Sequence, residues 1–329
     1  MSTVKPIKPG KPVEQRLTLR LGAPAAGTAE RLARFRTAGA ELHGARDFLL
    51  PLEQLEGHGL EAWWLAEGLT PRTAAEDVQA VAADGLLLCE ACAPDASDPR
   101  EAARQLYERL LRFVVANGYP HVVKGWNYLE DINEGSGDEE RYKQFCVGRG
   151  EVLDTLWTHD YLPAGTGVGS GAGTGLRVTL LASRQKPGII ENPRQVSAYR
   201  YPRQYGPQSP SFSRASSIGD AGDRLLFISG TAAIVGHDSL HLASIEGQVG
   251  ETLRNWQSLF DAYEERHGVR PGFAGEGWYR VYLRRPEHLA VARRMLGEAG
   301  LPLHRTLFLR ADICRRELLF EMDAVIATD

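Results

Sequence analysis

The stretch ADICRRELLFEMDAV, residues 311–325, stands close to the C-terminal end of the chain and decides how the fold is interpreted. Side chains of a β-strand alternate between two faces. A strand here points four apolar residues one way: Phe320, Met322, Ala324 and Ile326. Four others point the opposite way: Leu319, Glu321, Asp323 and Val325. Carboxylates are seldom buried without partners, so this stretch, taken alone, predicts that the second face meets solvent.

The sequence before this stretch alternates strands and helices. Strands are predicted at 224–230 (RLLFISG), 277–284 (GWYRVYLR) and 305–313 (RTLFLRADI), with helices at 244–268 and 286–300. The longer helix carries apolar side chains at helical spacing: Ile245, Val249, Leu253, Trp256, Leu259, Phe260 and Tyr263. The C-terminal third is therefore a mixed α/β unit whose sheet is completed by the closing strand.

The first half follows the same pattern. A helix is predicted over 97–118, with Asp98 as its cap and Gly118 at its end. Its buried stripe contains Leu106, Leu110, Phe113 and Val114. Strands are predicted on either side, at 84–93 (DGLLLCEACA) and 121–129 (HVVKGWNYL).

The glycine-dense stretch AGTGVGSGAGTG, residues 164–175, is not a dinucleotide-binding loop. Such a loop follows a strand and opens a helix, whereas this one precedes the strand-like LRVTLLASR. We expect a loop whose backbone passes close to another group.

The segment ENPRQVSAYRYPRQYGPQSPSFSRA, residues 191–215, has too many prolines and too little periodicity for a helix or a central strand. It is also too aromatic for a disordered linker. We therefore expect a functional loop and place a domain boundary at its start. The predicted organisation is a flexible tail (1–16), an N-terminal α/β domain (17–190) and a C-terminal domain (191–329).

Composition restricts the class of protein. The 329 residues are 43% hydrophobic and 24% charged, with a net charge of −4 and no basic run, which argues against nucleic-acid binding. No segment has the length and hydrophobicity of a membrane span, and the N-terminus lacks a signal-peptide pattern. The four cysteines do not form a disulfide scaffold, and Cys89 and Cys92 are expected to be buried apolar side chains. A cytoplasmic protein follows as the expectation.

The C-terminal third resembles the RidA/YjgF-like fold. The resemblance depends on Gly206–Pro207, on a strand ending in Ser229–Gly230, on a helix with the pattern Q-x-x-x-T-L-x-N (Gln248, Thr252, Leu253, Asn255) and on the ending Glu321–Ala324. Simple members of that superfamily are trimers that hydrolyse enamines and imines. In them an arginine fifteen residues before the glutamate grips the substrate carboxylate. Here that position is Thr306, with Arg305 beside it, which departs from the pattern.

Longer motifs are similar to a narrower group, the chorismatases, which include the 3-hydroxybenzoate synthases. The matching pieces are 140–149 (ERYKQFCVGR), 162–170 (LPAGTGVGS), 191–215, 229–237 (SGTAAIVGH) and 309–325 (LRADICRRELLFEMDAV). This resemblance implies an α/β fold of mixed sheets, with a RidA/YjgF-like C-terminal domain packed against a related or irregular N-terminal α/β domain. It also implies a monomer of secondary metabolism that uses no metal and no organic cofactor.

The resemblance implies a site between the two halves of the chain. Arg149 and Arg214 would grip the carboxylates of chorismate, and Tyr142 and Tyr201 would donate hydrogen bonds to it. Glu321 would be the acid that protonates the enolpyruvyl methylene, provided that an apolar pocket keeps it protonated. Leu319, Phe320 and Met322 are expected to form that pocket. Asp323 is expected to be a solvated or structural carboxylate.

Two further positions are implied to distinguish the products. Ala232, after Ser-Gly-Thr, favours a hydrolase that gives a dihydroxycyclohexadienoate, whereas Cys314 is compatible with a synthase. We expect pyruvate and 3-hydroxybenzoate, with 4-hydroxybenzoate as a further possible product. Two alternatives stay open: a RidA-like enamine or imine deaminase, in which Arg305 reaches the pocket, and a binding protein without catalysis.

Overall fold

The fold was obtained as a computed structural model. It describes residues 48–57, 77–82, 85–221 and 224–328 with their side chains, and the backbone of further strands between residues 17 and 83. The tail expected at residues 1–16 lies outside the described residues.

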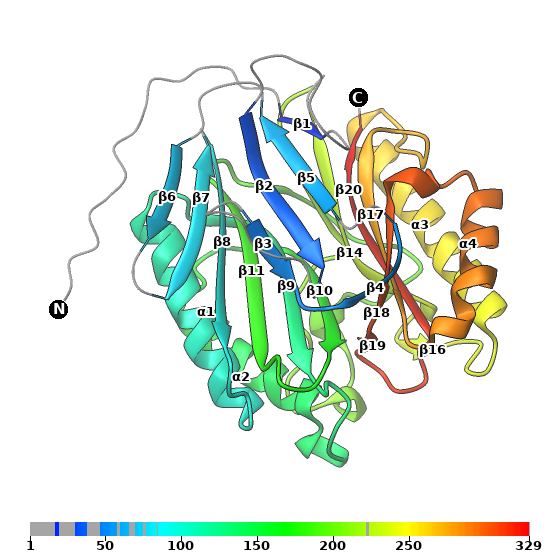
Figure 1. Cartoon of the computed structure of the whole chain (residues 1–329), viewed down its shortest axis with the longest axis horizontal. Coiled ribbons are helices and arrows are strands. Elements are labelled where there is room, and N and C mark those ends of the chain that lie inside the picture. Colours follow the sequence, from blue (N-terminus) through cyan, green and yellow to red (C-terminus); the bar gives the residue numbers. More distant parts are fainter. Residues whose placement is uncertain are drawn as a thin grey trace.

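Two seven-stranded sheets form the centre of the molecule (Figure 1). In order across the first sheet the strands are β19 (Asp312–Ile313), β10 (Ala164–Ser170), β9 (His121–Glu130), β11 (Leu176–Ser183), β8 (Leu86–Ala93), β7 (Val78–Ala83) and β6 (Thr70–Ala74). In the second they are β12 (Gly188–Ile190), β13 (Ala215–Ile218), β14 (Leu225–Ala232), β20 (Phe320–Ala327), β17 (Gly277–Leu283), β18 (Thr306–Arg310) and β4 (Glu53–Glu56).

Each sheet combines antiparallel pairs with one parallel pair, β9–β10 in the first and β17–β18 in the second. A four-stranded sheet holds β1 (Leu17–Leu19), β5 (Leu60–Leu65), β2 (Glu30–Thr37) and β3 (Asp47–Leu50). A short hairpin holds β15 (Ile234–Val235) and β16 (Asp238–Ser239). The α/β fold with mixed sheets is thus confirmed.

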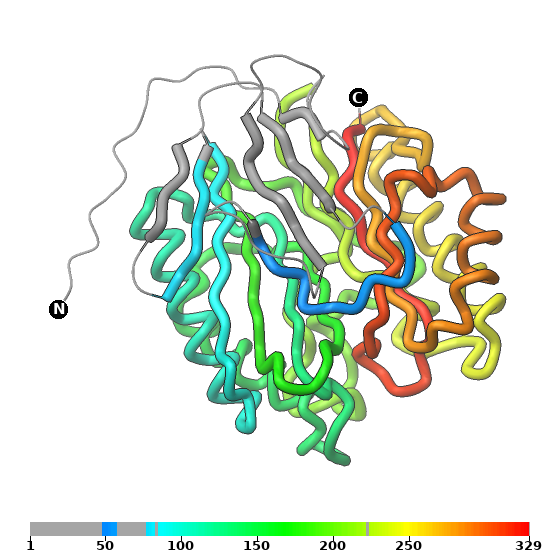
Figure 2. Tube along the Cα trace, in the orientation of Figure 1, coloured from blue at the N-terminus to red at the C-terminus, as the bar shows by residue number. Residues whose placement is uncertain are grey.

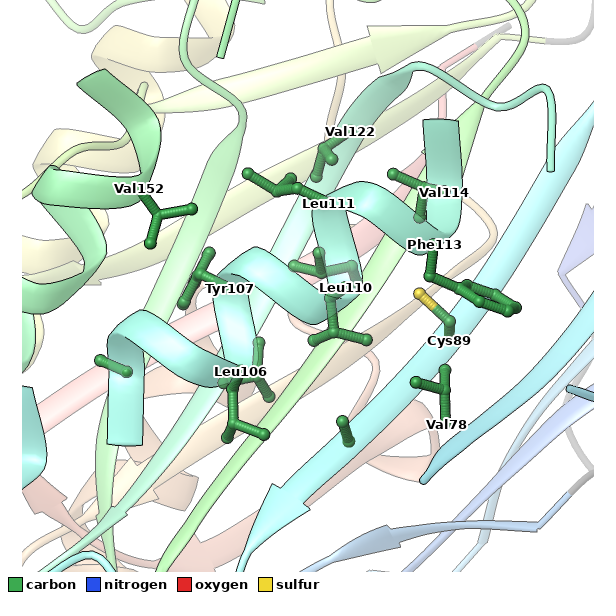
Figure 3. Packing of buried hydrophobic residues seen from close by; sticks show 14 of the residues in the cluster. Val78, Cys89, Leu106, Tyr107, Leu110, Leu111, Phe113, Val114, Val122 and Val152 are labelled. Carbon is green, nitrogen blue, oxygen red and sulfur yellow. The ribbon is translucent and has the colours of Figure 1, made fainter. Parts of the chain in front are cut away.

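Two helices, α1 (Pro99–Ala116) and α2 (Arg141–Leu156), pack together beside the first sheet. Asp98 caps α1 by accepting the Glu101 amide proton at 3.0 Å. The predicted stripe of Leu106, Leu110, Phe113 and Val114 is buried against the sheet, beside Cys89 (Figure 3). The predicted helix and its buried face are confirmed.

The other two long helices, α3 (Ile245–His267) and α4 (Leu289–Glu298), cover the second sheet on the opposite side of the molecule (Figure 1). The core beneath them takes one face of β20, as predicted: Phe320, Met322, Ala324 and Ile326. The opposite faces of the two sheets pack against each other through a third core that includes Trp126, Phe227 and Val325. The layers are therefore helix, sheet, sheet, helix.

Strands are exchanged between the two halves of the chain. Strand β19, from the C-terminal half, pairs with β10 in the first sheet, and β4, from the N-terminal half, pairs with β18 in the second. Figure 2 shows the segment that contains β4 reaching the C-terminal strands. This exchange fixes the position of one sheet relative to the other.

The glycine-dense stretch differs from the expectation. Residues Ala164–Ser170 form the buried strand β10, where a loop was expected, and only residues 171–175 turn the chain. The expected close approach is present, because a β-carbon on Gly169 would lie 2.7 Å from side-chain atoms of both Ile132 and Asp312. The alternating glycines therefore let neighbouring elements pack tightly on the strand.

The segment 191–215 is irregular, as predicted, with two short 3₁₀ turns at Ala198–Arg200 and Arg203–Tyr205. It joins the two halves: Arg203 forms a bidentate ion pair with Asp138, at 2.6 and 2.9 Å, and the Ser213 amide donates to the Pro163 carbonyl. No helix in the described part of the chain combines the length and the hydrophobicity needed to cross a bilayer.

Candidate active site

A cavity of about 210 Å³ opens where the two sheets meet α2 and the segment 191–215. All seven residues singled out from the sequence line it: Tyr142, Arg149, Tyr201, Arg214, Ala232, Cys314 and Glu321. The first two come from α2, the next two from the irregular segment, and the others from β14, the 314–317 turn and β20. Their roles in catalysis stay predictions, but their positions are compatible with one shared ligand.

The expected solvent-exposed acidic face does not exist. Glu321 is 4% exposed and Asp323 is 2% exposed. Strand β20 lies between β14 and β17, and the face that carries both carboxylates turns toward the first sheet. The alternation of the sequence was interpreted correctly, but a second sheet covers the face that was expected to meet water.

The pocket around Glu321 is also built differently from the expectation. Phe320 and Met322 point to the opposite core, beneath α3 and α4, and Leu319 joins that core because β20 begins only at Phe320. The cavity around the carboxyl group is lined instead by residues such as Thr166, Gly230 and Ala232.

A β-bulge brings Gly230 against the acid. The register between β14 and β20 shifts by one residue between Ile228 and Thr231, and Ala232 pairs directly with Glu321. A β-carbon on Gly230 would overlap the Glu321 Oε1 atom. Only a glycine leaves room for the carboxyl group here, which is a physical reason for the Ser-Gly motif.

Asp323 is a structural carboxylate, and the alternative of a solvated one is wrong. Its Oδ2 accepts hydrogen bonds from Thr166 Oγ1 (2.6 Å), Trp126 Nε1 (3.0 Å) and Tyr282 OH (3.3 Å). Lys124 Nζ lies 3.5 Å from the same oxygen. Donors and a cation both favour the ionised form of a carboxyl group.

Lys124 is the principal residue that the sequence reasoning did not identify. Its side chain is fully buried, and its Nζ donates to Thr166 Oγ1 and to the Ile228 carbonyl, both at 2.8 Å. Burial lowers its pKa to about 8, and the charge of Asp323 opposes this shift. A signal was present, because a lysine in the middle of a strand as apolar as HVVKGWNYL requires buried partners.

Glu321 has the protonation state of an acid catalyst. Its pKa is raised to about 8, mainly by burial and also by the charge of Asp323, although Lys124 and Arg214 act in the opposite direction. No hydrogen bond from another described residue stabilises its ionised form. At neutral pH the carboxyl group therefore holds a proton that it can deliver into the cavity.

The two predicted arginines keep unused donors. Arg149 donates through Nη2 to the Ser211 carbonyl, with its guanidinium 5.1 Å from the Tyr107 ring centre. Arg214 donates through Nη2 to the Val196 carbonyl (2.7 Å) and to Tyr201 OH (2.9 Å). The other guanidinium nitrogens of both arginines have no hydrogen-bond partner among the described residues. Buried cations that retain donors suit an anionic ligand.

Tyr142 and Cys314 are neutral groups in this cavity. Burial holds the pKa of the Tyr142 phenol well above its usual range, so the phenol remains a donor. Burial and the nearby Glu321 raise the pKa of the Cys314 thiol, which argues against a thiolate nucleophile. Cys314 therefore shapes the cavity as a small, weakly polar side chain.

Arg315 is a further cavity residue that the sequence reasoning missed. Its guanidinium lies 4.0 Å from the Tyr205 ring centre and 5.2 Å from that of Tyr201. Its Nη1 donates to the His237 carbonyl and to Ser239 Oγ. The paired arginines of CRRE were the only signal for it.

Other candidates lie elsewhere. Arg305 is not among the residues that line the cavity. Cys89 is buried as expected, but Cys92 is exposed, because it lies near the end of β8, where burial of the strand ceases. Within the described ranges, no three His, Cys, Asp or Glu side chains are grouped so that they could hold a metal ion.

The polar residues of the Q-x-x-x-T-L-x-N helix support two walls of the cavity. Gln248 accepts the Leu319 amide proton at 2.7 Å and donates to the Glu317 carbonyl at 3.0 Å, which fixes the chain just before β20. Asn255 donates to the carbonyls of Ala232 (3.0 Å) and Ile234 (2.9 Å), which fixes the end of β14.

Comparison with known proteins gives consistent matches. The family model described as "Chorismatase FkbO/Hyg5-like, N-terminal" matches residues 61–182. A chorismatase of Streptomyces rapamycinicus is 33% identical over 272 residues, which cover 80% of this chain and 81% of that protein. A 3-hydroxybenzoate synthase of Streptomyces hygroscopicus is 34% identical over 248 residues, which cover 72% and 73% respectively. The crystal structure of a chorismatase superposes with a TM-score of 0.82 at 27% identity, covering 99% of this chain and 100% of that one.

Proposed function

We propose, because this chain belongs to the chorismatase family, that it is an enzyme that cleaves the enolpyruvyl ether of chorismate and releases pyruvate. The observation that carries the proposal is the buried Glu321 carboxyl group, whose pKa of about 8 keeps it protonated in a cavity that also contains Arg149 and Arg214. The protonated carboxyl group suits the enol ether of chorismate, which is cleaved by acid, and the two arginines suit its two carboxylates.

Chorismate carries one carboxylate on its ring and one on its enolpyruvyl group. Each guanidinium can bind one carboxylate by donating its remaining N–H groups, since charge-assisted hydrogen bonds are the strongest that side chains form. Tyr142 and the hydroxyl of Tyr201 can add neutral donors. Both arginines are buried and keep guanidinium nitrogens that no described residue engages, so a carboxylate can bind them without breaking hydrogen bonds within the protein.

The first chemical step is protonation of the vinyl methylene by Glu321. The carbon–carbon π electrons form the new C–H bond, and the adjacent carbon becomes an oxocarbenium centre stabilised by the ether oxygen. Glu321 is left as a carboxylate next to the cation that it created. Lys124 and Arg214, which favour its ionised form, stabilise this charge as it develops.

Two continuations balance the atoms. In the hydrolytic one, water adds to the cationic carbon and returns a proton to Glu321; the hemiketal collapses to pyruvate and a dihydroxycyclohexadienoate. In the synthase one, the neighbouring ring hydroxyl adds to that carbon. The hydroxyl proton returns to Glu321, which leaves a cyclic ketal. The bond between that hydroxyl oxygen and the ring then breaks as the ring carbon bearing the ether oxygen loses its proton. The resulting hemiketal collapses to pyruvate and 3-hydroxybenzoate, and no water is consumed.

We favour the second continuation. Cys314 in the cavity wall and the relative named 3-hydroxybenzoate synthase support it, whereas Ala232 favours hydrolysis. The deaminase alternative loses its main support, because Arg305, the residue expected to grip its substrate, is not part of the cavity wall.

Product analysis tests the proposal. Purified protein is incubated with chorismate, and pyruvate, hydroxybenzoates and dihydroxycyclohexadienoate are separated by chromatography. We expect pyruvate release that Glu321→Gln abolishes. Glu90→Gln is the matched control, because Glu90 is an equally buried carboxyl group, paired with Arg177 away from the cavity, and should retain turnover. Turnover near the wild-type rate in Glu321→Gln would remove Glu321 from the acid role.

A further inference from the structure

Asn255 is a fully buried side chain that holds the end of β14 without lining the cavity itself. Its Nδ2 donates to the carbonyls of Ala232 and Ile234, and its Oδ1 accepts from Arg194 Nε at 3.0 Å. The three bonds fix the orientation of the amide, since its nitrogen meets two acceptors and its oxygen meets a donor. Arg194 is in turn paired with Glu251.

The backbone that Asn255 holds forms the cavity wall beside Glu321. Ala232 is the direct cross-strand neighbour of Glu321, and both Ala232 and Ile234 line the cavity. On the other side, the Leu240 amide donates to the Ala233 carbonyl at 2.9 Å. Asn255 and Leu240 therefore clamp residues 232–234 from two directions, next to the atom that delivers the proton.

We infer that Asn255 is a positioning residue that decides how the oxocarbenium intermediate is captured, by keeping the 232–234 wall close enough to exclude water. The inference depends on the proposed cleavage of chorismate. It assigns the choice of product to a residue that touches neither the substrate nor the acid.

The physical reason lies in the two continuations of the reaction. Capture by the ring hydroxyl is intramolecular and needs no additional space, whereas capture by water needs room for one more molecule beside the cationic carbon. Ala232 leaves only a methyl group between its backbone and the cavity. The position of that backbone, and not the bulk of a side chain, therefore sets the available space. A wall released by losing both donors of Asn255 would admit water.

The test is the product share of the purified full-length protein acting on chorismate. In Asn255→Ala we expect the ratio of dihydroxycyclohexadienoate to hydroxybenzoate to rise by at least about threefold, since small displacements change competing rates strongly. Tyr263→Phe is the matched control. Tyr263 lies in the same helix, is equally buried and bonds Thr328 at 2.8 Å, far along the helix from the wall, so its product ratio should equal that of the wild type.

A second variant serves if Asn255→Ala does not fold. Arg194→Met keeps a partly exposed, unbranched side chain and removes both the bond to Asn255 Oδ1 and the ion pair with Glu251, while Glu251 retains His241 and Arg254. We expect a smaller rise of the ratio in the same direction.

Three results would overturn the inference. The first is an unchanged product ratio in a folded Asn255→Ala variant that has lost turnover or thermal stability, which is the result expected of a purely structural residue. If Asn255→Ala does not fold, the same result in Arg194→Met counts instead. Another is an equal shift in Tyr263→Phe. The third is a wild-type protein that forms only the dihydroxycyclohexadienoate. In all three, pyruvate is still released, so the proposed cleavage stands; absence of pyruvate from the wild type would refute the cleavage instead.

Discussion

Replacing Glu321 by glutamine should stabilise the protein, and the gain should grow with pH. The carboxyl group has an ordinary pKa of 4.5, and burial raises it to about 8 in the folded state. Between these values the folded state binds a proton that the unfolded state has released. The stability that the protonated Glu321 carboxyl group contributes is therefore fully present below pH 4.5, its ordinary pKa, and is lost as the pH rises through its folded-state pKa of about 8.

The magnitude follows from the two values. Between about pH 5.5 and about pH 8.5, titration of Glu321 costs about 3 kcal/mol of folding free energy. Glutamine has the same shape and no charge to bury. The stability difference between Glu321→Gln and the wild type should therefore increase by about 3 kcal/mol between these two conditions.

Urea unfolding of both proteins at the two pH values measures this difference. Glu101→Gln is the control: hydrogen bonds from Arg104 lower the pKa of Glu101 to about 2, so its titration lies below this pH range. Its difference from the wild type should not change between the two conditions. If the difference for Glu321→Gln is equally flat, the carboxyl group is ionised in the folded protein and cannot be the acid.

The same proton should control turnover. With a pKa of about 8, the protonated fraction of Glu321 falls about tenfold between about pH 7 and about pH 9. Chorismate turnover by the wild type should fall with it, on an alkaline limb centred near that pKa. A rate that stays constant over this range would contradict the assignment independently of the unfolding data.

Two other substitutions probe the cavity. In Gly230→Ala the new methyl group would overlap the Glu321 carboxyl group, so we expect turnover to fall by about tenfold or more with little change in fold. Gly171→Ala is the control, because nothing lies within 4 Å of its added methyl group, and it should behave like the wild type. Equal activity of the two variants would show that the Glu321 carboxyl group does not need the space beside Gly230. Arg214→Lys keeps the charge but loses the planar set of donors, so we expect the KM for chorismate to rise by about tenfold. A KM unchanged within a factor of two would mean that Arg214 does not bind a carboxylate.

Local patterns predicted the fold well where one element determines the outcome. The cap at Asp98, the stripe of α1 and the two faces of β20 depend on neighbouring residues only, and all were confirmed. The glycine-dense stretch was misjudged because glycine disfavours strands in general. In β10 it is needed for close packing against Ile132 and Asp312, which lie far away in the sequence.

The candidate site was predicted as a set of residues but not as an environment. Family motifs pointed to seven positions, and the structure gathers them in one cavity. Exposure of Glu321 was predicted wrongly because strand alternation gives the direction of a side chain, not what covers it. The covering sheet is assembled from strands β9 and β10, more than 150 residues earlier, and no periodicity within β20 indicates their presence.

The structure gives the two carboxyl groups of β20 different environments, which supports Glu321 and not Asp323 as the proposed acid. Glu321 and Asp323 lie two residues apart on the same strand face, and both are buried. Thr166, Trp126 and Tyr282 all donate to Asp323, and Lys124 lies beside it, so partners compensate the burial of this carboxyl group. No described residue donates a comparable hydrogen bond to Glu321, and burial together with the nearby Asp323 raises its pKa to about 8. The asymmetry of donors thus distinguishes a hydrogen-bonded structural carboxyl group, beside the buried lysine of β9, from a second one whose raised pKa suits the proposed acid.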